Sequence, residues 1–208
     1  MGNWSVTLLS AFAAIAVLAL LYHGVVRPWH LRWGTIGDEV TRPLPGDDFA
    51  SESNTPATHA ISINASAKDI WPWLVQMGQG RGGFYSYTSL ENLVGCQMKN
   101  ANEIVPEWQL LEVGDPISLH PKAPRLKVIV LGEHRALVLG GRSDETPDNE
   151  NERKRSQKYG QSVFSWAFVL DEHSADYTRL IARARGHVGE HHADGLSGID
   201  INGHGDEF

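Results

Sequence analysis

The chain has 208 residues, 41% of them hydrophobic, a formal net charge of −7 and one cysteine. This length suffices for one domain of ordinary size with an appendage. The negative charge argues against nucleic acid as a partner, because neutralising phosphates requires a basic face. The single cysteine, Cys96, excludes an internal disulfide and a cysteine-rich zinc site.

The first predicted element is an uncharged apolar segment, residues 6–22, VTLLSAFAAIAVLALLY. About 17 residues is the lower limit for a helix that crosses a bilayer, and Trp4 and Tyr22 stand at its ends, where amphipathic rings favour the interface. No basic residue precedes the segment, which favours a transmembrane anchor, residues 1–24, over a cleaved signal peptide. Arg27 and Arg32 follow it, so the positive-inside tendency predicts a single-pass membrane protein with a cytoplasmic domain.

Residues 25–57 are predicted to form an irregular linker that wraps onto a domain over residues 58–185. The linker contains many chain breakers, namely Pro28, Pro43, Pro45, Gly46 and Pro56. The alternating segment HAISINA then predicts the first strand of the domain.

A helix is predicted within SAKDIWPWLVQMG, where Ser66 and Asp69 have the spacing of a capping box. Its apolar face is expected to contain Ile70, Trp73, Leu74 and Met77. Pro72 predicts a kink or a late helix start, and Gly78 predicts the helix end.

A second short helix is predicted at SLENLVG, followed by the strand-like segments PISLH, LKVIVL, ALVLGG, SVFSWAFVL and TRLIARARG. The alternation in SVFSWAFVL places Phe164, Trp166 and Phe168 on one face of a strand. Residues 141–160 are polar without apolar periodicity and predict a mobile loop. This order of elements predicts an α+β domain, with helices on one face of a curved antiparallel sheet.

The segments PWHLRWGTIGDEVTRPLPGDD, WPWLVQMGQGRGGFYSYTSLENLVG, ANEIVPEWQLLEVGD, ALVLGGR and WAFVL together resemble one group of the SRPBCC superfamily. These are START-like, Bet v 1-like helix-grip proteins, often described as polyketide cyclase or dehydrase-like, and the resemblance covers roughly residues 28–185. It implies a sheet wrapped around a long C-terminal helix with an apolar cavity between them. It implies no single chemistry, because such folds host transport, binding and a few enzymatic activities.

The glycine-rich segment QMGQGRGGFYSY has three interpretations. A phosphate-binding loop is disfavoured, because its glycines follow a helix and no lysine is near. A turn that lets two short helices pack closely on the sheet is the plain structural interpretation. A pocket rim is the functional interpretation, since ligand pockets are mostly aromatic and apolar with few polar groups. The predicted ligand-binding residues are Trp73, Met77, Arg81, Phe84, Tyr85, Tyr87, Trp108 and Trp166.

The sequence contains no nucleophile elbow and no Ser-His-Asp order with supporting spacing. Glu91 and Glu107 are the candidates for a buried acid or base, although a surface role suits both. The histidines at 187, 191, 192 and 204 suggest a metal site, but the glycines among them oppose a helix that would align them. We therefore predict no metal and no cofactor, and assign no catalytic residue.

The C-terminal residues 186–208, GHVGEHHADGLSGIDINGHGDEF, depart from the pattern of the superfamily. They have no amphipathic stripe and many glycines, so we predict that the closing helix is missing and that the tail is disordered or loosely packed. The concave face of the sheet would then be partly exposed, and a homodimer or the membrane could cover it.

The function predicted from these features is a membrane-anchored protein that binds a small apolar ligand or lipid. A cyclase or hydratase-type enzyme acting in the helix-grip cavity and a non-enzymatic partner-binding module are the alternatives. The sequence does not name the ligand.

Overall fold

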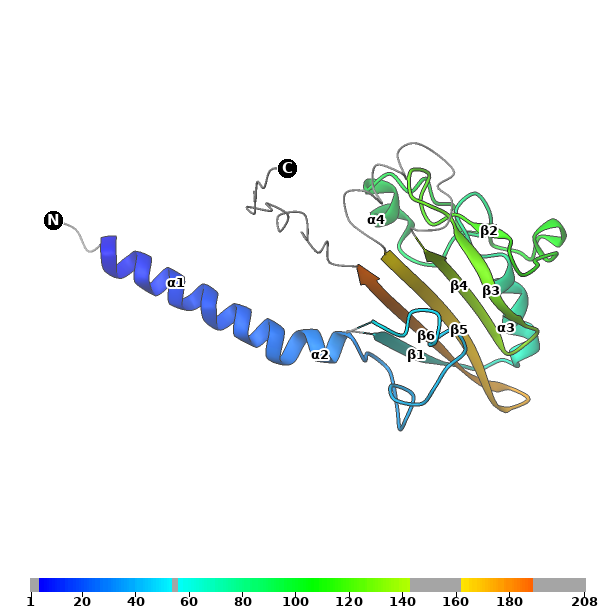
Figure 1. Ribbon diagram of the computed structural model, residues 1–208, viewed down its shortest axis with the longest axis horizontal. Coiled ribbons are helices and arrows are strands. Elements are labelled where there is room, and N and C mark those ends of the chain that lie inside the picture. Colours follow the sequence, from blue (N-terminus) through cyan, green and yellow to red (C-terminus); the bar gives the residue numbers. More distant parts are fainter. Residues whose placement is uncertain (1–3, 54–55, 143–161, 189–208) are drawn as a thin grey trace, which may run out of the picture.

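The computed structural model describes residues 4–53, 56–142 and 162–188. A long N-terminal helical segment leads into an α+β domain built on one six-stranded antiparallel sheet (Figure 1). The predicted fold class, an α+β domain with an antiparallel sheet and an apolar N-terminal helix, is confirmed.

The N-terminal helical segment consists of α1 (Trp4–Leu21), the π-helical turn η1 (Tyr22–Val26) and α2 (Arg27–His30). Pro28 has no N–H and its ring would clash with the carbonyl group one turn back, so a widened turn just before it accommodates the proline. Residues Thr7–His30 are long and apolar enough to cross a membrane by length and composition. The helical segment therefore continues six residues beyond the predicted end of the anchor at residue 24, into what was predicted as an irregular linker.

The sheet has the strand order β1-β6-β5-β4-β3-β2, and every neighbouring pair is antiparallel. The strands are β1 (Ala57–Ile63), β2 (Pro116–Ile117), β3 (Leu126–Gly132), β4 (Ala136–Arg142), β5 (Ser162–Ser174) and β6 (Tyr177–Val188). Five segments form strands as predicted, namely HAISINA, LKVIVL, ALVLGG, SVFSWAFVL and TRLIARARG, whereas PISLH contributes only the short β2.

One face of the sheet, which we call the helix face, packs against α3 (Ala67–Val75). Ser66 caps α3, because its hydroxyl oxygen accepts a hydrogen bond from the Asp69 amide at 3.1 Å. The helix starts directly after this cap, so the late start that Pro72 predicted is wrong. The short helix α4 (Thr88–Leu93) and the 3-10 turn η2 (Pro106–Trp108) follow in the chain.

The buried face of α3 differs from the predicted one at one position. Trp71, not Trp73, is buried in the main core with Ile70 and Leu74. Trp73 is only half-buried and packs edge-on against Tyr85, with ring centroids 5.6 Å apart. The spacing of apolar residues alone does not decide between Trp71 and Trp73. A small rotation of the helix about its axis brings either ring toward the sheet.

The opposite face of the sheet is covered by residues Gly34–Ser53, which we call the outer strap. Arg179 on β6 binds Glu39 of the strap through two hydrogen bonds, Nε to Oε1 at 2.8 Å and Nη2 to Oε2 at 2.7 Å. Arg183 binds Asp47 at 2.6 Å and the carbonyl oxygens of Glu39, Val40 and Arg42. The strap thereby buries Leu44 against Ala60 and Ile181, as the predicted wrapping linker requires.

The strap begins at the edge of the sheet beside β1. The amides of Thr58 and Ala60 donate hydrogen bonds to the carbonyl oxygens of Leu31 and Trp33, at 2.8 and 3.2 Å. Gly34 has a φ of +75°, and a Cβ there would collide with the carbonyl oxygen of Ala60. The chain can therefore approach this edge only with glycine at position 34.

Two predicted segments lie partly outside the described residues. The predicted mobile loop, residues 141–160, falls outside them apart from Gly141 and Arg142, which end β4. The predicted loose tail starts at Gly186, yet Gly186, His187 and Val188 are the last residues of β6. Pairing with β5 stabilises these three residues as a strand whatever their helix propensity, and the rest of the predicted tail, residues 189–208, lies outside the described residues. In the part of the chain that the structure describes, no helix follows β6.

We predict that replacing Glu39 by glutamine lowers the free energy of unfolding by about 3 kcal/mol or more, because it leaves a buried guanidinium without its counter-charge. Both side chains are nearly inaccessible, at 5% for Arg179 and 7% for Glu39. The matched control is Asp171→Asn, which breaks the half-exposed Arg42–Asp171 pair and should cost less than about 1 kcal/mol. Urea denaturation of the full chain in detergent measures the free energy of unfolding of both variants. Equal losses of stability would contradict a larger role for the buried pair than for the half-exposed pair.

The same ion pair predicts a dependence of stability on pH. Burial raises the pKa of Glu39, but the hydrogen bonds from Arg179 and the Ile36 amide and the charges of Arg179 and Arg42 outweigh it, so the net pKa is lowered. A carboxyl group whose pKa is lower in the folded protein stabilises it above the ordinary carboxyl range, and this contribution disappears as the pH falls through the folded value. The stability difference between wild type and Glu39→Gln should therefore shrink in acid.

Candidate functional site

The helix face carries a row of aromatic rings along β5. The rings of Trp166 and Phe168 lie 4.7 Å apart, and Phe84, which follows the glycine-rich turn, lies 5.7 Å from Trp166. Phe168 is buried, whereas Phe164, Trp166 and Phe84 are only partly buried at the margin of the main core. We call Phe84, Phe164, Trp166 and Phe168 the aromatic row.

Beside the aromatic row, β6 presents small side chains on the same face. Phe168 pairs with Ala182, Trp166 with Ala184 and Phe164 with Gly186. Large rings on one strand next to small side chains on its neighbour make a stepped apolar surface. At the edge of the sheet, Ile61 on β1 pairs with Leu180 on the same face and is 43% exposed, so α3 does not cover this edge. The predicted partial exposure holds for Phe164 and Trp166 but is wrong for Phe168, which lies deeper under α3.

The glycine-rich turn, residues 78–83, uses its backbone groups internally. The amides of Gly78, Gln79, Arg81, Gly82 and Gly83 all donate to protein carbonyl groups. An anion cradle needs such amides free and pointing at the ligand. A Cβ on Gly82 would come within 2.8 Å of both the Gln76 carbonyl oxygen and the Tyr85 hydroxyl group. The turn therefore serves close packing, in agreement with the structural interpretation of this segment.

Gln76 holds the glycine-rich turn to the loop before β2. Its side chain is fully buried and donates to the Tyr85 hydroxyl group at 2.7 Å and to the Glu103 carbonyl oxygen at 3.1 Å. The side-chain oxygen Oε1 of Gln76 accepts hydrogen bonds from the Val105 amide at 3.1 Å and from the side chain of Gln109 at 3.3 Å. Every hydrogen-bonding group of the amide is thus satisfied, and the contacts fix where Tyr85 lies.

Arg81 lies half-buried under the same loop. Its Nη2 donates to the Trp108 carbonyl oxygen at 2.7 Å and to the Val75 carbonyl oxygen at 3.3 Å. Burial lowers the pKa of Arg81, and the charge of Asp115 partly opposes this. Arg81 therefore ties the end of α3 to η2 through hydrogen bonds to protein carbonyl groups.

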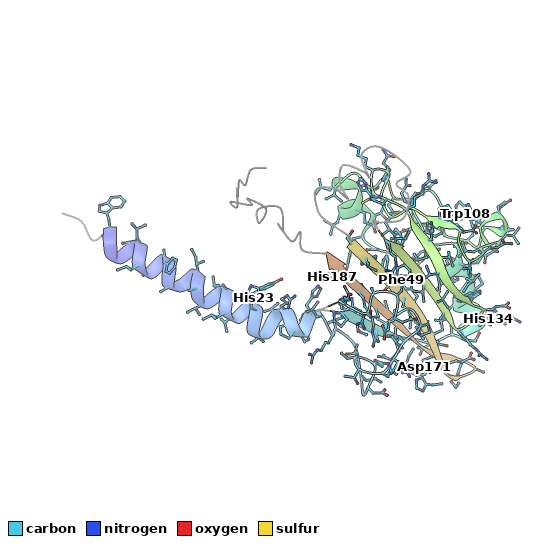
Figure 2. All side chains as sticks on the ribbon, in the orientation of Figure 1. His23, Phe49, Trp108, His134, Asp171 and His187 are labelled. Carbon is cyan, nitrogen blue, oxygen red and sulfur yellow. The ribbon has the colours of Figure 1, made fainter. Side chains whose placement is uncertain are left out.

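The structure brings only some of the predicted site residues together. Phe84 and Trp166 meet in the aromatic row, and Met77 is buried in the adjoining core. Trp73 and Tyr85 form a separate pair, and burial raises the pKa of Tyr85, partly offset by the Gln76 hydrogen bond. Tyr87 is 76% exposed before α4. Trp108 lies at the end of the domain far from the N-terminal helix (Figure 2).

The structure describes no group of three or more His, Cys, Asp or Glu side chains that could hold a metal, within the residues it covers. Of the histidines considered above, only His187 lies among the described residues. Glu107 is exposed and Glu91 is half-buried, with Oε2 lacking a hydrogen-bond partner in the described part of the chain.

Sequence reasoning missed Gln76 and the small residues of β6. Gln76 follows an apolar helix face and could have been recognised as a buried polar residue only from the segments that surround it in space. Ala182, Ala184 and Gly186 alternate with arginines in TRLIARARG. That period-two pattern was an available signal that β6 has one small-residue face and one arginine face.

Comparisons with known proteins add little. No family model matches the chain, and no curated protein matches it. Norcoclaurine synthase from Thalictrum flavum in complex with dopamine and hydroxybenzaldehyde is similar at 14% identity and a TM-score of 0.36, over 72% of this chain and 79% of that one. The conserved protein EF2215 from Enterococcus faecalis is similar at 15% identity and a TM-score of 0.30, over 67% of this chain and 64% of that one.

A third solved structure, MLL2253 from Mesorhizobium loti, has 16% identity and a TM-score of 0.31, over 62% of this chain and 76% of that one. The match to EF2215 spans just under two thirds of that protein. These similarities are compatible with the predicted Bet v 1-like class, but at TM-scores below 0.5 they carry no argument. The fold class rests on the strand order and on the helix face, and membership of the SRPBCC superfamily stays a prediction.

We predict that Gln76→Leu lowers the free energy of unfolding by at least about 2 kcal/mol, because several buried groups lose their hydrogen bonds. It should also raise the mobility of Tyr85, which Gln76 positions. Gln79→Leu in the same turn is the control, because Gln79 bonds to the Ser118 carbonyl oxygen through its backbone amide, which the substitution keeps. Denaturation followed by tryptophan fluorescence measures the effect, and similar losses in both variants would contradict the role of Gln76.

Proposed function

We propose that this chain is a membrane-anchored protein that binds a small apolar ligand on the helix face of its sheet. The observation that carries the proposal is the aromatic row, which continues into partly exposed apolar side chains. Folding usually buries most of the surface of such large rings, because each contributes a large apolar area. Rings left at the margin of a core beside small side chains suit a flat or elongated apolar ligand.

Two features support binding on this face over the opposite one. The outer strap covers the opposite face through Arg179 and Arg183, and no comparable arginine contacts hold a segment over the aromatic row in the described residues. The side chains of Gln76 and Arg81, near the aromatic row, donate hydrogen bonds to carbonyl oxygens of the protein itself. The proposed site therefore offers shape and apolar area rather than charge.

The composition and exposure of the N-terminal helical segment support its proposed role as a membrane anchor. Thr7–His30 has a mean hydropathy of 2.1, and none of it is buried against the domain. Exposed apolar side chains all around a helix of this length suit a lipid environment. The positions of Arg27 and Arg32 at the domain end favour a cytoplasmic domain.

We predict that small apolar molecules co-purify with the full-length protein and are identified by native mass spectrometry followed by solvent extraction. Ala184→Phe should reduce their occupancy about tenfold, because the added ring fills the step beside Trp166. Ala123→Phe, in the loop before β3, is the control and should keep the ligand. Consistently empty wild-type protein, or equal occupancy in the two variants, would overturn the proposed site.

The anchor has its own test. Full-length protein should sediment with membranes and resist extraction at alkaline pH, and its intact mass should include Met1–Tyr22. Deleting those residues should release the domain into the soluble fraction. A mature protein that lacks the segment would show a cleaved signal sequence instead.

A second function, binding of a protein partner, is favoured by the outer surface of α4. Leu90 and Leu93 on this helix are 61% and 82% exposed, and Tyr87 and Val94 on either side of it are also exposed. Exposed apolar clusters of this kind mark interaction sites in soluble domains. Leu90→Ser/Leu93→Ser should abolish a partner interaction without changing ligand occupancy, and this separates the two functions.

A further inference from the structure

The domain-proximal end of the helical segment carries exposed aromatic and cationic side chains. Trp29 is 62% exposed, Trp33 48% and Ile36 60%. Arg27 and Arg32 stand among them in the chain, and within the described residues no carboxylate pairs with either one. Glu39, which follows these residues in the chain, is engaged by Arg179. We call Arg27, Trp29, Arg32, Trp33 and Ile36 the collar.

Helix length decides where the membrane surface lies. Trp4 and Tyr22 are separated by about 27 Å at 1.5 Å per residue, slightly less than the roughly 30 Å of a hydrocarbon core. Trp4 and Trp29 are separated by about 37 Å, which crosses the core and places both rings in the interfacial layers. The continuous helical segment Trp4–His30 thus makes Trp29, and not Tyr22, the aromatic residue at the second interface.

The collar is also connected firmly to the domain. Leu31 and Trp33 accept hydrogen bonds from Thr58 and Ala60 of β1, and His59 Nε2 donates to the His30 carbonyl oxygen at 2.8 Å. Figure 1 shows the helical segment leaving the domain at β1. A flexible linker would let the domain move away from the membrane, whereas these contacts hold the β1 edge next to the end of the helix.

We propose that the collar binds the headgroup layer of the bilayer, with a preference for anionic lipids, and holds the β1 edge of the domain against the membrane surface. This rests on the proposed anchor and extends it. Trp29, Trp33 and Ile36 enter the interfacial layer, while Arg27 and Arg32 contact lipid phosphate and carboxylate groups. The occupant is lipid because the collar is continuous with the apolar helix. The uncovered end of the helix face, at Ile61, then lies near the bilayer, and this allows a membrane-derived ligand to reach it.

Tryptophan quenching in the full-length protein tests the proposal. The protein is reconstituted in nanodiscs of phosphatidylcholine and phosphatidylserine, with lipids brominated close to the headgroup or left unbrominated. In wild type, Trp4, Trp29 and Trp33 should be quenched. Trp29→Phe/Trp33→Phe should reduce the quenchable emission to about a third, since Trp4 alone would remain in the interface. Trp108→Phe is the matched control, because Trp108 lies at the far end of the domain (Figure 2), and it should leave the quenchable emission unchanged.

The outcomes separate the collar from the anchor. Quenchable emission that is the same in Trp29→Phe/Trp33→Phe and in wild type would overturn the collar and leave the anchor intact. Complete lack of quenching in wild type would overturn the anchor and the collar together. In nanodiscs without phosphatidylserine, quenching of Trp33 should fall about twofold, and Arg27→Gln/Arg32→Gln should abolish this lipid dependence. Equal quenching with both lipid mixtures would overturn the preference for anionic lipids.

Discussion

The contacts of the β6 arginines with the outer strap are the constraint on which the arrangement of this domain depends. Arg179 and Arg183 are almost fully buried, so their charges require the carboxylates and carbonyl groups that the strap supplies. Because the strap follows the N-terminal helix directly in the chain, the same contacts determine where that helix meets the sheet. Ile181 and Leu44 become buried only when the strap is in place.

As a result, the two faces of the sheet differ in chemistry. The arginine face is satisfied by polar contacts within the chain, whereas the helix face is apolar and only partly covered by α3. Alternation along β6 makes the division possible, since Arg183 points to the strap while Ala182 and Ala184 lie beside the aromatic row. A ligand site on the helix face therefore does not compete with the contacts that stabilise the fold.

The glycine-rich turn and the aromatic row have separate roles, although they are adjacent in the chain. Gly82 and Gln76 pack and bond the turn, which places Phe84 against Trp166. The turn thus acts on the proposed site through position and not through contact with a ligand. At the β1 edge of the sheet, hydrogen bonds from Thr58 and Ala60 join the strand to the residues that follow the N-terminal helical segment.

The sequence by itself determined the features that depend on neighbouring residues. The apolar span, the Ser66 cap and the alternation of β5 all follow from local patterns, and the structure contains each of them. Only the tertiary structure decided that Trp71 replaces Trp73 in the core, that Gln76 is a buried clamp and that Gly186–Val188 belong to a strand. Arg179 and Glu39 are separated by 140 residues, and no local pattern records such a pair. Their attraction is specific only once chain folding brings them together and removes water from around them.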